Sequence, residues 1–143
     1  MGKVQEFIHY MGNKIDHKIE KKKRFYFNVK NTDLRFVVDY LFNKMECRLS
    51  TATGMEMYHG LEILYHFSDD KNGQYYCPRV VIEDKENPKV NSIVGIVQGA
   101  EWIEREIFDF WGVNFIDHPR MEKLLTLNND IIKEKPMRMR RES

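Results

Sequence analysis

The sequence predicts an α+β domain with two layers, in which a mixed or antiparallel β-sheet carries its helices on one face. Helical and alternating apolar patterns are segregated along the chain, in the order α-β-β-α-β-β-β followed by one more helix and an extended tail. Runs of strands separated from helices favour this class over a doubly wound parallel sheet. The 143 residues, 42% hydrophobic and 31% charged, suffice for one core.

The chain is expected to begin with a helix and a hairpin. Apolar residues at helical spacing predict a helix over residues 4–11, which ends at Gly12. Residues 15–19 and 25–29 alternate between apolar and polar side chains on either side of the charged residues 20–24, which predicts two paired strands. The half-buried side of the first strand is expected to carry Ile15, His17 and Ile19.

A second helix and three strands follow. Asn31 or Thr32 can cap the helix. Its apolar face comprises Leu34, Val37, Val38, Leu41, Phe42 and Met45. Strands are predicted over residues 46–53, 58–68 and 74–83. Asn72-Gly73 predicts a tight turn between the last two, because both residues tolerate positive φ. Residues 90–99 are apolar but short, so a helical turn and irregular structure both stay open.

Residues 100–119, AEWIEREIFDFWGVNFIDHP, carry the densest pattern of the chain. A helix is expected to end at Gly112, because glycine has no Cβ and adopts the left-handed C-terminal conformation easily. Arg105 lies four residues from both Glu101 and Asp109, which predicts an ion-paired row along one helix face. The predicted apolar stripe consists of Ile103, Ile107 and Phe110.

The acidic residues and the histidine of this segment raise a chemical alternative. Glu104, Glu106, Asp109 and His118 are residue types that bind metal ions or transfer protons. The spacing is not that of a HExxH metal site, and Arg105 stands among the carboxylates, where it would repel a cation. A structural or docking role is therefore favoured, with a metal-dependent hydrolase as the remote alternative.

The same segment resembles the signature of the C-type subunit of respiratory complex I, the NADH:quinone oxidoreductase family. The family includes the related subunit of energy-converting, membrane-bound nickel–iron hydrogenases. The matching positions are Trp102, Glu104, Arg105, Glu106, Asp109, Gly112, Phe115, His118 and Pro119. Downstream, Leu124-Leu125 and residues 135–138 fit the family's closing segment. Two positions depart from it: Asp117 replaces a customary glycine, and Glu122 stands at a usually basic position.

The resemblance implies a non-catalytic, cofactor-free structural subunit in the cytoplasmic arm of a membrane-bound redox complex. It would dock on the large catalytic subunit, which carries either a quinone site or a nickel–iron centre, near the small iron–sulfur subunit. Iron–sulfur clusters, and a nickel–iron centre or flavin, would then belong to those partners. The matching positions would serve structure and partner docking, with no catalytic, cofactor-binding or metal-binding residue among them. A hydrogenase parent and a complex I parent stay open.

Composition agrees with these implications. The net charge of +1 gives no overall attraction to nucleic acid, and no apolar run approaches the roughly 18 residues of a membrane-spanning helix. We therefore expect a cytoplasmic chain that reaches the membrane only through partners. We expect no nucleic-acid partner, because the basic residues 21–24 and 138–141 are the only sequence support for a nucleic-acid-binding module. Cys47 and Cys77 are too few to hold an iron–sulfur cluster.

The end of the chain differs from the rest. One α+β domain is expected over residues 1–130, and residues 131–143 form a basic tail with few apolar side chains. Such a tail should be disordered alone and become ordered along a partner. Candidate contacts within it are Lys135, Pro136 and Arg138.

Overall fold

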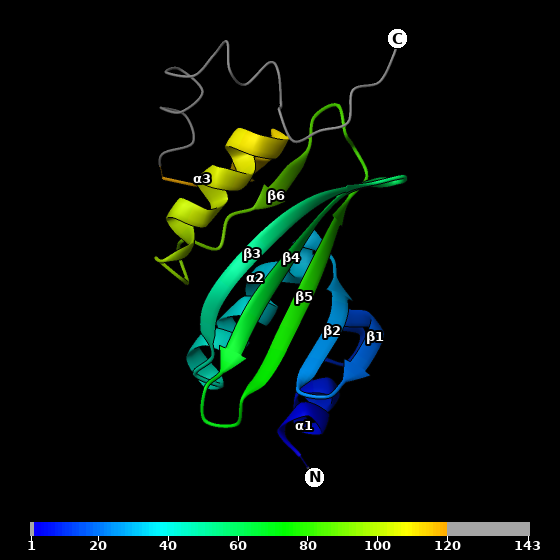
Figure 1. Ribbon diagram of the computed structural model, residues 1–143, viewed down its shortest axis with the longest axis vertical. Helices are drawn as coiled ribbons and strands as arrows, with labels where there is room; N and C mark the ends of the chain where they lie inside the picture. Colours follow the sequence, from blue (N-terminus) through cyan, green and yellow to red (C-terminus); the bar gives the residue numbers. More distant parts are fainter. Residues whose placement is uncertain (1, 120–143) are drawn as a thin grey trace.

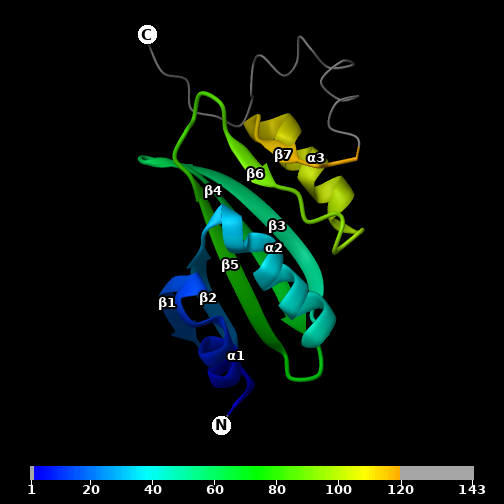
Figure 2. The same cartoon turned by 180° about the vertical axis from the view of Figure 1, so that it is seen from behind.

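The computed structural model describes residues 2–119 and confirms the α+β class (Figures 1 and 2). The elements in chain order are α1 (Lys3–Met11), the short 3-10 helix η1 (Gly12–Lys14), β1 (Ile15–Lys21), β2 (Arg24–Val29), α2 (Asn31–Asp39), the π-helical turn η2 (Tyr40–Lys44), β3 (Arg48–Met57), β4 (Gly60–Asp69), β5 (Gln74–Ile82), β6 (Lys89–Asn91), α3 (Ala100–Trp111) and β7 (Asn114–Ile116). The predicted order lacks the two short strands β6 and β7, which flank α3.

Five strands form one mixed sheet in the order β1-β2-β5-β4-β3. All neighbouring pairs are antiparallel except β2 and β5, which run parallel. Strands β6 and β7 pair in parallel as a separate two-stranded sheet. This small sheet ties the chain before α3 to the chain after it.

The helices share one face of the main sheet, as expected. Phe7 of α1 packs on Phe27 of β2 and Tyr76 of β5, with ring centroids 5.3 and 5.2 Å apart. At the other edge, Trp111 of α3 lies against Gly54 of β3. Gly54 is paired with a core residue of β4, and residues opposite each other in an antiparallel pair point to the same side. Figure 2 shows α2 in front of the strands on this face.

The predicted apolar face of the second helix is confirmed, but its last turn is not α-helical. Leu34, Val37, Val38 and Leu41 are buried, and Phe42 and Met45 pack against the core from η2. The turn predicted between β4 and β5 is present, and Gly73 has φ of +67°, but Asn72 does not take a positive φ. The open stretch, residues 90–99, contains the end of β6 followed by hydrogen-bonded turns.

The predicted burial of β1 is wrong beyond its first residue. Ile15 is buried, but Ile19 is half exposed and His17 is exposed. The pairing register of β1 with β2 shifts between Asp16 and Ile19, and His17 has φ of +48°. A bulge of this kind changes which side of the strand faces the core, and bulges are common at sheet edges.

Candidate functional site

Helix α3 presents different residues inward than the sequence predicts. Ile107 and Phe108 are buried and Ile103 is partly buried, whereas Phe110 is 46% exposed. The inward face follows positions 104, 107, 108 and 111, so Phe110 lies on the other side of the helix. The predicted end of the helix is confirmed: Gly112 has φ of +74°, and its N–H donates to the carbonyl oxygen of Phe108 at 2.8 Å.

Glu104 is a buried anchor for the turn that precedes α3. Its side chain is fully buried and accepts hydrogen bonds from Ser92 Oγ at 2.6 Å and from the backbone N–H of Ile93 at 2.8 Å. Ser92 Oγ in turn accepts from the N–H of Val94. Burial raises the pKa of the Glu104 carboxyl to about 7, although these hydrogen bonds and the charge of Arg35 lower it. The residue thus fixes the backbone after β6.

The outward face of α3 carries an aromatic and charged cluster. Trp102 is 63% exposed, and its indole N–H donates to Glu106 Oε1 at 2.7 Å. The guanidinium of Arg105 lies 5.2 Å from the Trp102 ring centroid, a cation–π geometry. These two contacts hold the Trp102 side chain in one orientation at the surface. With Phe110 from the same helix and Ile116 of β7, which is 40% exposed, they define what we call the α3 docking face.

The predicted ion-paired row is wrong in its details. Within residues 2–119 no salt bridge joins Arg105 to Asp109, and the buried Nε of Arg105 has no hydrogen-bond partner. The two side chains still interact electrostatically. Partial burial raises the pKa of the Asp109 carboxyl, and the nearby positive charge of Arg105 partly opposes that rise. Glu106 contacts Trp102 instead of Arg105.

The segment after α3 folds back onto the start of the helix. Phe115 is buried, and His118 is 8% exposed with its Nε2 3.1 Å from the carbonyl oxygen of Glu101. Because a carbonyl oxygen only accepts, Nε2 is the donor. Pro119 is exposed at the end of the described chain. The histidine thus fastens the strand β7 segment to the first turn of α3.

Arg35 of α2 is a structural residue that the sequence reasoning missed. Its Nε donates to the carbonyl oxygen of Ser92 at 2.9 Å, and its Nη2 donates to that of Ile116 at 3.0 Å. Nη2 also lies 3.2 Å from Asp117 Oδ2. One side chain therefore joins α2 to the carboxyl ends of both β6 and β7, which lie side by side at the same end of the small sheet. An arginine on a helix surface carries no signal for such a role, because its partners are backbone carbonyls distant in sequence.

The four candidate metal-binding side chains do not converge. Glu104 points into the core, Glu106 lies on the outer face, and His118 contacts a backbone carbonyl. Across residues 2–119 there is no group of three or more His, Cys, Asp or Glu side chains that could hold a metal ion. Glu104, Glu106 and His118 thus have separate partners in the described part of the chain. The candidate tail contacts, Lys135, Pro136 and Arg138, lie outside the described residues, as do residues 131–143.

These features define an α+β domain in which helix α3 has an anchored inner face and an exposed aromatic outer face. The sequence profile described as the respiratory-chain NADH dehydrogenase 30 Kd subunit matches residues 27–142, most of the chain. The chain belongs to this family. The match covers the elements from within β2 through α3 and continues beyond the described residues.

Individual relatives agree with the family assignment. The chain is 34% identical over 95 residues to the C-type subunit of NADH-quinone oxidoreductase from Ruegeria pomeroyi, covering 62% of this chain and 46% of that protein. It is 35% identical over 75 residues to the C/D-type subunit from Bacteroides thetaiotaomicron, covering 52% of this chain and 14% of that protein. The chain thus spans less than half the length of these relatives.

Two solved structures share the fold. One belongs to the membrane-bound sulfane sulfur reductase, an archaeal respiratory membrane complex, with a TM-score of 0.67, 23% identity, and coverage of 83% of this chain and 71% of that one. The other is the trypsin-resistant fragment of Nqo5, with a TM-score of 0.62, 18% identity, and coverage of 81% and 95%. No helix in residues 2–119 is long and apolar enough to span a membrane.

Proposed function

We propose that this chain is a structural subunit that docks through the α3 docking face on the large catalytic subunit of a membrane-bound redox complex. The observation that carries the proposal is the exposure of Trp102, Phe110 and Ile116 on elements that are otherwise firmly anchored. Exposed aromatic side chains of this kind are the usual anchors of protein interfaces. Relatives named as subunits of NADH-quinone oxidoreductase support a partner of this class.

The anchoring of α3 supports docking because it fixes the geometry of the exposed side chains before the partner arrives. Glu104 holds the helix to the turn before it, His118 holds it to the segment after it, and Arg35 clamps the adjacent carboxyl ends of β6 and β7. Trp102 is oriented by Glu106 and Arg105. A face that needs no ordering on contact loses less conformational entropy on binding.

On this proposal the chain supplies area, rigidity and fixed charge, and redox centres belong to its partners. These would be the large subunit, with a quinone site or a nickel–iron centre, and a small iron–sulfur subunit. Flavin would be held by other subunits of a complex I parent. The chain would lie on the cytoplasmic side and contact the membrane only through the complex. An obligate interface of this type buries about 2,000 Å² or more in total.

The test is affinity purification of the tagged full chain from its native membrane in mild detergent, with mass spectrometry and metal analysis. Truncating a central interface aromatic costs about 2 kcal/mol or more. That loss is roughly a thirtyfold weakening of Kd. We expect Trp102→Ala/Phe110→Ala to lose the large subunit, and the matched control Tyr58→Ala, at a 98% exposed tyrosine away from α3, to retain it.

The same purification distinguishes the two parents. Nickel together with iron in the recovered large subunit identifies a hydrogenase-type complex. Iron–sulfur and flavin subunits without nickel identify a complex I type. Equal recovery of the large subunit by the double variant and by the control would refute docking through α3, whichever parent is found.

A further inference from the structure

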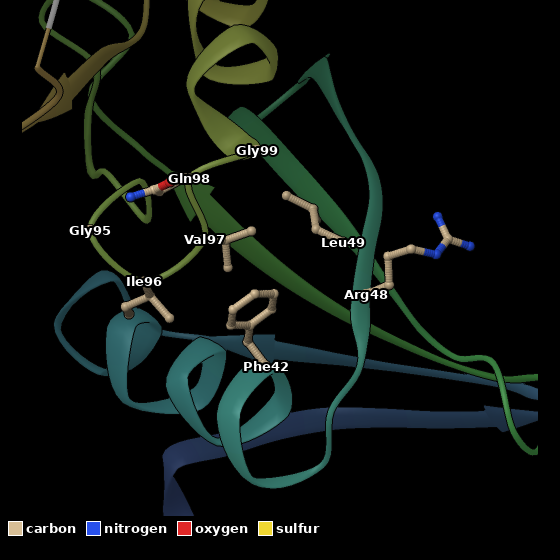
Figure 3. Close-up of a pocket in the computed structure, with 8 residues that line it drawn as sticks. All are labelled: Phe42, Arg48, Leu49, Gly95, Ile96, Val97, Gln98 and Gly99. Atoms are coloured by element: carbon tan, nitrogen blue, oxygen red, sulfur yellow. The ribbon is translucent and has the colours of Figure 1, made fainter.

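An apolar groove of about 480 Å³ opens between η2, the start of β3 and the turn that leads into α3 (Figure 3). Its apolar lining comes from Phe42 of η2 and Leu49 of β3 on one side and from Ile96 and Val97, in the turn before α3, on the other. In Figure 3 the side chains of Phe42, Leu49 and Val97 point toward one another. The volume lies within the range of about 300–1,000 Å³ in which proteins enclose ligands.

The lining favours an apolar ligand. Arg48, the one charged residue of the lining, points away from the groove, and its guanidinium pairs with Asp70 at 3.1 Å. Sites for small polar molecules place a few polar groups so that they converge on the ligand. This groove instead offers apolar carbon surface. Beside it, Gly95 and Gly99 face open space, since a Cβ added at either would meet no atom within 4 Å. It is built for apolar side chains.

The end of the described chain lies close to this groove. His118 Nε2 donates to the carbonyl oxygen of Glu101 at 3.1 Å, and the N–H of Glu101 lies 3.2 Å from the carbonyl oxygen of Gln98, which lines the groove. His118, the residue before Pro119, is therefore linked through Glu101 to a residue that lines the groove. Five further residues can span up to about 16 Å at roughly 3.3 Å each.

The sequence after Pro119 supplies a fitting occupant. Residues 120–125 read RMEKLL, so the first adjacent pair of large apolar side chains after Pro119 is Leu124-Leu125. We infer that the Leu124-Leu125 pair of the same chain fills the groove between η2, β3 and the turn before α3. The contact would cover apolar surface that is otherwise in water, and each buried leucine side chain contributes by the hydrophobic effect. This inference does not rest on the proposed docking function.

The test is disulfide trapping in the full-length chain at low protein concentration. Leu124→Cys, and separately Leu125→Cys, is combined with Ile96→Cys or with Leu49→Cys on the opposite wall. The matched control combines the same tail cysteine with Met55→Cys, an exposed position of β3 that pairs with Glu62 and so lies on the sheet face away from the helices. The native Cys47 and Cys77 are buried and occur equally in every variant.

We expect at least one groove pair to form an intramolecular disulfide about tenfold faster than the control pair, because a held contact raises the effective concentration of the thiols. Peptide mapping identifies the bond. Equal rates for groove and control pairs would overturn the inference and leave the groove to a partner protein. Disulfide-linked dimers between two singly substituted chains, formed faster than the intramolecular bond, would overturn it in favour of a second copy.

Discussion

Glu104 makes the stability of this domain depend on pH in a direction opposite to that of an ordinary ion-paired carboxylate. Its side chain is fully buried, and burial raises the pKa of the carboxyl from 4.5 to about 7 in the folded chain. Between these two values the folded chain binds more protons than the unfolded chain. Stability is therefore greatest below the unfolded pKa and falls as pH rises through the folded pKa.

The size of this effect follows from the two pKa values. One pKa unit corresponds to about 1.4 kcal/mol, so the full loss across the transition is about 3 kcal/mol, of which roughly 2.5 kcal/mol falls between pH 5 and pH 8. Glu104→Gln removes the titration while its amide can still bond to Ser92 and to the N–H of Ile93. Between pH 5 and pH 8 the free energy of unfolding of Glu104→Gln should thus rise by about 2–3 kcal/mol relative to that of the wild type.

Urea unfolding of the full chain at half-unit pH intervals, followed by circular dichroism, measures this difference. Comparing variant with wild type cancels the contributions of the other titrating groups. Glu106→Gln is the control, because that carboxylate lies on the exposed face and contacts the indole of Trp102. A difference between Glu104→Gln and wild type that stays constant from pH 5 to pH 8, or that shifts toward wild type, would refute the reasoning.

Three further predictions concern packing, the clamp and the thiols. Gly54→Ala should destabilise the fold by about 1–3 kcal/mol in thermal unfolding, because its Cβ would lie 2.7 Å from the Trp111 indole, and unchanged stability would contradict this close packing. Arg35→Ala should cost about 1–2 kcal/mol in urea unfolding by removing partly exposed charged donors from two carbonyls, and equal stability of the variant would contradict the clamp. Burial raises the pKa of Cys47 to about 12 and of Cys77 to about 11, so a thiol reagent at pH 8 should modify both at least about tenfold more slowly in the folded chain than in urea, and rapid labelling of either would contradict this burial.

Local patterns in the sequence were sufficient for the elements whose signals are local. The apolar face of α2, the turn at Gly73 and the left-handed end of α3 at Gly112 were all predicted, because each depends on residues within one turn of chain. The α+β class followed from the segregation of these elements. The parallel pairing of β2 with β5 was not predictable in this way, since it joins strands separated by α2 and two other strands.

The candidate docking segment was found from the sequence, but its internal contacts were not. The segment stood out because its residue types recur in a known family, yet spacing alone suggested that Arg105 pairs with Asp109 and that Phe110 is buried. Residues at positions 101, 105 and 109 do share a helix face, and which partner each side chain takes depends on neighbours from elsewhere in the fold. Glu104 can be buried because Ser92 and Ile93 donate hydrogen bonds to its carboxylate. The guanidinium of Arg105 lies over the Trp102 ring.

The departure at Asp117 shows how the fold compensates for a residue that the family pattern does not favour. Asp117 has φ of +69°, a conformation that glycine adopts without steric cost and that aspartate tolerates better than most residues. Its carboxylate lies 3.2 Å from Arg35 Nη2, the same nitrogen that donates to the carbonyl oxygen of Ile116. The ion pair offsets part of the backbone strain and adds a side-chain contact to the clamp. The substitution therefore keeps the turn after β7 and leaves His118 in place to hold the first turn of α3.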